Sequence, residues 1–133
     1  MSTTIDGSAG IIGAPGGLTS AGSTGIGYST GAGGTVTQAT SRTTAVTLNA
    51  LTGAITMFTA AGSTTPASFT VNNSLVANTD VIVVSIKSGA ANTYVISAQT
   101  VQNGLFILTF YTTGGVASDA PVINFAVIKG ASS

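Results

Sequence analysis

From residue 34 to the end, the chain is a succession of short runs rich in β-branched and aromatic residues, separated by turn-forming residues. Runs of this kind, bounded by Gly, Asn, Pro and Ser, are typical of β-strands. No segment shows an apolar repeat of helical period over a useful length. We expect strands at Thr35–Thr40, Thr44–Asn49, Gly53–Phe58, Ser68–Val71, Asp80–Lys87, Tyr94–Ala98, Leu105–Tyr111 and Val122–Lys129.

The spacing of these runs predicts an all-β fold, because many short strands with regular turns are typical of sandwiches and jelly rolls. We expect a single antiparallel β-sandwich over residues 34–133, jelly-roll-like and of about eight strands. Asn103-Gly104 between two apolar runs is the strongest hairpin signal in the chain. The strand order does not follow from the pattern, so a jelly roll and an immunoglobulin-like sandwich both remain open.

Residues 1–33 differ sharply from the rest of the chain, because most of the 18 glycines lie there. Glycine loses the most backbone entropy on ordering, so this segment should not fold alone. It is either a disordered tail or an extended arm that orders on a partner. Isolated apolar side chains favour the arm, and the predicted contact residues are Ile5, Ile11, Ile12 and Leu18.

The later strands carry apolar residues on both faces, whereas an exposed antiparallel sheet usually keeps one face polar. Either something covers the second face, for which a further copy of the chain is the simplest cover, or small exposed Val and Ala are tolerated on the surface of the sheet. The near absence of charge agrees with self-association, because a net charge of zero gives little protection from it. The predicted oligomer interface comprises Val81, Val83, Phe106, Phe110, Phe125 and Val127.

Charged residues make up only 5% of the chain, with three basic and three acidic side chains and no His or Cys. The usual nucleophile–base arrangements and N/S zinc sites therefore have no residues to build them. Three basic residues are too few for the phosphate contacts of a nucleic-acid-binding protein. We expect no catalytic, cofactor-binding or metal-binding residues, and Asp80 with Asp119 is the only carboxylate pair in the folded part that an enzyme could use. Arg42 either pairs with an Asp across a subunit interface or is solvated.

Membrane insertion is not expected either, since no apolar run approaches the ~20 residues of a spanning helix. The first residues lack the basic region of a secretion signal. Abundant Ser and Thr can hydrate the protein surface without charge. The interactions of a surface of this kind are insensitive to salt and pH.

Several motifs resemble a recurrent β domain of structural proteins from tailed bacteriophages and prophages. They are GYSTGAGGTVTQATSRTTAVTLN at residues 27–49, GAITM at 53–57 and VINFAVIKG at 122–130. Members of this group include small capsid cement or decoration proteins and domains of longer fibre-like chains, and no catalytic residues come with the resemblance.

The resemblance implies a capsid cement protein. We expect a homotrimer on the outer surface of the virion that binds the major capsid protein through the arm and stabilises contacts between capsid subunits. The alternative is a head- or tail-fibre module that binds a glycan on the host surface.

Overall fold

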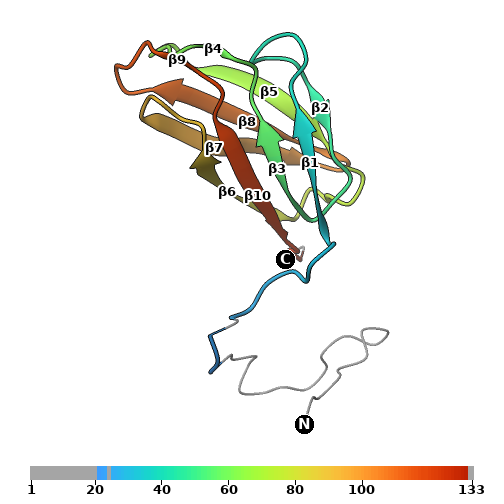
Figure 1. Ribbon diagram of the computed structural model, residues 1–133. Helices are drawn as coiled ribbons and strands as arrows, with labels where there is room; N and C mark the ends of the chain where they lie inside the picture. Colours follow the sequence, from blue (N-terminus) through green and yellow to red (C-terminus); the bar gives the residue numbers. More distant parts are fainter. Residues whose placement is uncertain (1–20, 24, 132–133) are drawn as a thin grey trace.

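The computed structural model describes residues 21–23 and 25–131, and these form an all-β sandwich of two four-stranded sheets (Figure 1). The predicted contact residues of the arm lie outside the described residues. Sheet A has the strand order β1 (Gly33–Thr37), β3 (Thr52–Thr56), β10 (Val122–Ile128), β6 (Val81–Ser88). Sheet B has the order β2 (Val46–Thr47), β5 (Ala67–Asn72), β8 (Leu105–Thr112), β7 (Tyr94–Gln102). A short ladder of β4 (Ala60–Ala61) with β9 (Ser118–Asp119) closes one end.

The predicted sandwich is confirmed, and every run predicted as a strand overlaps one. The hairpin at Asn103-Gly104 is also confirmed: Gln102 pairs with Leu105, and Gly104 has the positive φ of 84° that such a turn needs. The short strands β4 and β9 were not predicted, because they lie in stretches of small residues with no strand-like pattern.

Two pairs of strands are parallel, which departs from the wholly antiparallel arrangement that we expected. β1 pairs with β3, and β2 pairs with β5. Parallel neighbours need a crossover connection, and here the opposite sheet supplies it. The chain leaves β1 for β2 in sheet B, returns to β3 in sheet A, and reaches β5 in sheet B again. All other neighbours in the two sheets are antiparallel.

The core lies between the sheets and is made of alternate residues of the strands. Phe106 and Phe125 meet across it with ring centroids 5.3 Å apart, and both are almost fully buried. Ile55, Val71 and Leu108 fill the space beside them with no exposed surface. Packing of this kind stabilises each large side chain by about 1.5–3 kcal/mol relative to exposure.

Four residues of the predicted oligomer interface belong to the core instead. Phe106, Phe110, Phe125 and Val127 are buried inside a single chain and are not free to contact a second one. The prediction is wrong for them because both faces of β8 and β10 are apolar, so the alternation did not show which face turns inward. The bulkier, aromatic-rich face does so.

No helix in the described part of the chain is long and apolar enough to cross a membrane.

Candidate functional site

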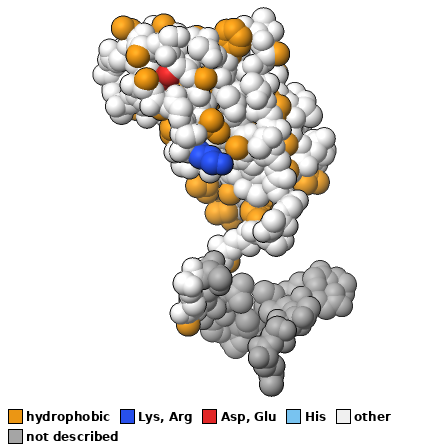
Figure 2. Space-filling model, in the orientation of Figure 1, with side chains coloured by type: hydrophobic (Ala, Val, Ile, Leu, Met, Phe, Trp, Pro, Cys, Tyr) orange, Lys and Arg blue, Asp and Glu red, His pale blue; other side chains and the backbone are white. Residues whose placement is uncertain are grey.

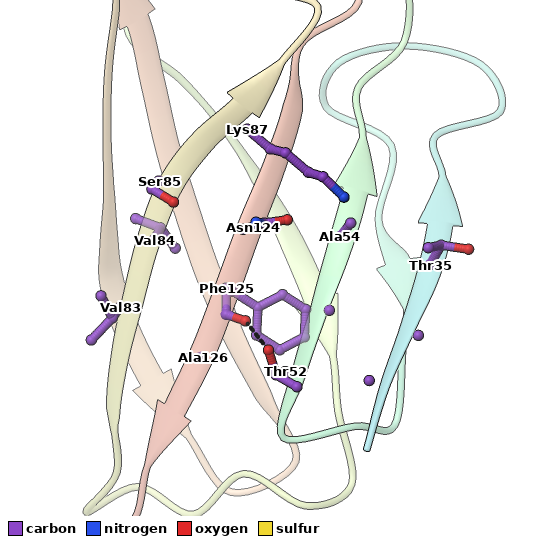
Figure 3. A pocket seen from close by; sticks show the side chains of 13 residues that line it. Thr35, Thr52, Ala54, Val83, Val84, Ser85, Lys87, Asn124, Phe125 and Ala126 are labelled. Atoms are coloured by element: carbon purple, nitrogen blue, oxygen red, sulfur yellow. Dashed lines mark hydrogen bonds between the residues drawn. The ribbon is translucent and has the colours of Figure 1, made fainter. Parts of the chain in front are cut away.

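The outer face of sheet A carries a surface hollow with a volume of about 430 Å³ (Figure 3). Its floor is low because small side chains occupy the outward positions of neighbouring strands. Thr52 on β3 pairs with Ala126 on β10, and Ala54 pairs with Asn124 in the next row. The hydroxyl of Thr52 donates to the Phe125 carbonyl at 3.0 Å, which keeps it flat against the sheet.

Lys87 is the charged residue of this hollow. It stands near the end of β6, and its side chain extends across β10 toward β3, so the ammonium lies above the floor (Figure 3). The described residues form two ion pairs, and Lys87 belongs to neither. The hollow therefore offers one cation, and its lining also includes the amide of Asn124 and the hydroxyls of Thr35 and Ser85.

An exposed aliphatic patch continues from the hollow along β6 and β10. We use this name for Val81, Val83 and Ile128, which are 55%, 49% and 57% exposed. The register places Ile128 beside Val81, and Ala126 beside Val83. Figure 2 shows hydrophobic side chains on this side of the molecule close to the point where the N-terminal segment leaves it. These three aliphatic residues lie on neighbouring strands, so their exposed surfaces adjoin.

The N-terminal segment reaches the sandwich beside this patch. The Tyr28 hydroxyl donates a hydrogen bond to the carbonyl of Val127, one residue before Ile128. Tyr28 and Ile26 both remain exposed, which adds two apolar side chains to the same end of the molecule. The hollow, the aliphatic patch and the start of the arm therefore share one side of sheet A.

A second group of polar residues lies at the opposite end of the sandwich. The Arg42 guanidinium donates to the Asp119 carboxylate and to the Tyr94 hydroxyl, each at 2.6 Å, and also to the carbonyls of Phe58 and Ala60. Among the described residues, no buried side-chain nitrogen or oxygen lacks a hydrogen-bond partner. The hydrogen bonds of this network join the loops around β4 and β9.

The Asp119 carboxylate is held in its charged form. Burial by itself would raise its pKa, but hydrogen bonds from Tyr94, Arg42 and the backbone amides of Ala91 and Asn92 lower the pKa to about 2. Burial raises the pKa of the Tyr94 hydroxyl, and donation to Asp119 raises it further. Neither group is poised to exchange protons near neutral pH.

Asp80 and Lys129 form the second ion pair, at the other end of β10. The Lys129 ammonium donates to the Asp80 carboxylate, and this hydrogen bond is the main reason that the pKa of Asp80 is lowered. Backbone amides of Ala77 and Gly130 also donate to it. β10 separates Asp80 from Asp119, which places them on the order of 20 Å apart at the rise of a β-strand. These two carboxylates do not form the close pair that glycoside hydrolysis needs.

The structure divides the predicted site residues into three groups. Val81 and Val83 lie on the surface, where an interface could use them. The other four predicted interface residues belong to the core, and the predicted arm contacts lie outside the described residues. The prediction did not include Ile128, because only the register of β10 with β6 places it beside Val81, and it did not include Lys87.

No protein-family model matches the chain, and comparisons with curated proteins and with solved structures find no match either.

Proposed function

We propose that this protein is a cement, or decoration, protein of a bacteriophage capsid. It forms a homotrimer on the outer capsid surface and stabilises contacts between major capsid proteins. The observation that carries the proposal is the aliphatic patch of Val81, Val83 and Ile128 beside the start of the arm. A contiguous aliphatic patch of this kind suits permanent assembly. The motifs at residues 27–49, 53–57 and 122–130, which resemble those of phage structural domains, support the same proposal.

The distribution of charge suits a protein that remains exposed outside a cell. Arg42, Asp80 and Asp119 are buried and bonded within the fold, so little charge is left on the described surface. Hydroxyl groups and backbone then interact with water, and neither titrates near neutral pH. Binding through such surfaces changes little with salt or pH.

The mechanism that we propose is avidity. The arm of each subunit contacts the capsid weakly through apolar side chains, and a trimer engages three sites at once. Binding of the assembled shell, and not of its dissociated subunits, stabilises the shell by mass action. The sandwich supplies a rigid body that holds the three arms together.

The test is co-sedimentation of the purified protein with capsids that have been stripped of it, with the bound amount quantified. We expect saturable binding in multiples of three and loss of binding for a chain that starts at residue 21. That truncated chain keeps the Tyr28 hydrogen bond and the whole sandwich, so circular dichroism should show an unchanged fold. Normal binding by the truncated chain would contradict the role of the arm, and no binding by the full chain would contradict the cement function.

A head- or tail-fibre module that binds a host glycan is the second candidate. The hollow on sheet A favours it, because Lys87, Asn124, Thr35 and Ser85 offer a cation, an amide and hydroxyls to a sugar. Binding of the isolated protein to a saccharide array, lost in Lys87→Ala, would support this function over the first. Phe125 is the aromatic residue among those that line the hollow, and its ring is buried in the core against Phe106, so it offers no platform for sugar stacking.

A further inference from the structure

Among the described residues, one base belongs to neither ion pair. The chain has three acidic and three basic side chains. Arg42 pairs with Asp119, and Lys129 pairs with Asp80. The remaining base is Lys87 in the hollow of sheet A. The remaining acid is Asp6, which lies in the arm, outside the described residues.

The hollow has the shape and chemistry to receive a stretch of backbone with small side chains. Its floor is formed by Ala54, Ala126 and Gly33, so a second chain can approach the sheet closely. The residues around Asp6 read TTIDGS, in which hydroxyl-bearing residues and glycine surround one isoleucine and the carboxylate. Such a segment can place its carboxylate at Lys87 and its isoleucine against Val83 without a bulky group over the floor.

The length of the arm allows this segment to reach another copy. Figure 1 shows that the described residues before β1 lead away from the sandwich and do not fold back over sheet A. The stretch from Asp6 to Ala21 spans up to roughly 50 Å when extended, which is enough to reach the next molecule of an oligomer.

We propose that the arm segment around Asp6 of one copy docks on the outer face of sheet A of a second copy, with the Asp6 carboxylate at the Lys87 ammonium. Ile5 then covers Val83, which supplies the missing cover for this end of the aliphatic patch. Ile11, Ile12 and Leu18 remain available for the capsid. The contact deepens the proposed function, since it rests on the chain forming a homo-oligomer.

Charge reversal tests the contact in the full-length protein. Asp6→Lys places two cations together and Lys87→Asp places two anions together, so each variant should associate more weakly than the wild type. We expect the dissociation concentration, measured by sedimentation velocity at low salt, to rise roughly fivefold for each lost contact, because exposed ion pairs are weak. Lys87→Arg keeps the charge and should keep the association. Thr4→Lys introduces a lysine two positions away while Asp6 stays in place, and it should have the smaller effect.

Mixing the two charge-reversed variants shows whether the arm docks on a second copy or on its own copy. In the mixture, the cationic arm of Asp6→Lys meets the anionic face of Lys87→Asp, so mixed oligomers should form although each variant alone associates poorly. If mixing restored nothing while the double variant Asp6→Lys/Lys87→Asp recovered wild-type behaviour, the arm would dock on its own domain and the proposal would be wrong. Unchanged association of both single variants would also overturn it.

These measurements use the protein alone and do not depend on capsid binding. If the protein failed to co-sediment with capsids while its self-association still depended on Asp6 and Lys87, the cement function would be overturned. The proposed contact between copies would then still hold. A wild-type protein that stays monomeric at all concentrations would overturn the contact and the proposed trimer together.

Discussion

The guanidinium of Arg42 lies 2.6 Å from the carboxylate of Asp119, although 77 positions separate the two residues in the chain. The pair joins the loop after β1 to β9, just before β10 begins, and both side chains are almost completely buried. The Tyr94 hydroxyl lies between them and hydrogen-bonds to both. An ion pair of this kind is costly to break, because the remaining charge is left buried without a partner.

Replacing one partner of this pair should therefore destabilise the fold. We expect Asp119→Ala to lower the free energy of unfolding by about 3 kcal/mol, since Arg42 keeps a buried charge. Tyr94→Phe removes one hydroxyl and should cost less, about 1.5 kcal/mol. Urea denaturation followed by circular dichroism measures both. A loss below 1 kcal/mol for Asp119→Ala would show that water reaches the guanidinium.

The acid side of the stability profile should depend on the two bonded aspartates. The folded-state pKa of Asp119 is about 2, and that of Asp80 is also below its ordinary value of 3.8. Because both are lower folded than unfolded, the unfolded state binds more protons and stability falls as the pH drops from about 5 toward 2. Between about pH 5 and 8 the profile should be flat, since the chain has no His and no Cys. Unfolding midpoints across this range, with a shallower acid fall in Asp119→Asn, check the assignment.

Gly53 should not tolerate a larger residue. A Cβ atom there would lie 2.6 Å from Leu48 Cδ2 and 2.8 Å from the carbonyl oxygen of Gly34. Overpacking of this kind costs about 1–3 kcal/mol. We expect Gly53→Ala to lower the urea midpoint and Leu48→Ala to restore only part of the loss, since the backbone contact remains. Gly27→Ala is the control, because nothing lies within 4 Å of a Cβ atom there.

The aliphatic patch should govern association rather than folding. We expect Val83→Asp to weaken self-association by at least tenfold while the urea midpoint changes little, because the side chain is half exposed in the single chain. Val95→Asp is the matched control: Val95 is exposed to a similar extent but lies on β7 in the opposite sheet. Sedimentation velocity compares the two variants, and equal effects would contradict a specific patch.

Phe106 lies in the core, although the sequence predicted it for the oligomer interface, and a substitution there separates the two roles. Because it is fully buried against Phe125, Phe106→Ala should cost about 3–5 kcal/mol of stability. An interface residue would instead change association and leave the unfolding of the monomer unaffected. Unfolding at several protein concentrations separates these outcomes.

Local pattern determined the class of fold. Strand propensity, turn residues and the spacing between them are properties of neighbouring residues, so the strands and the Asn103-Gly104 hairpin could be predicted from the chain alone. The composition also showed that the molecule has few charged side chains. The tertiary structure decided what depends on distant residues. It chose the inward face of β8 and β10, because two apolar faces are equivalent until the sheets pack. It brought Arg42 to Asp119 and kept Asp80 from it, and it laid Lys87 over a floor of small side chains, because strand order and register determine which residues meet.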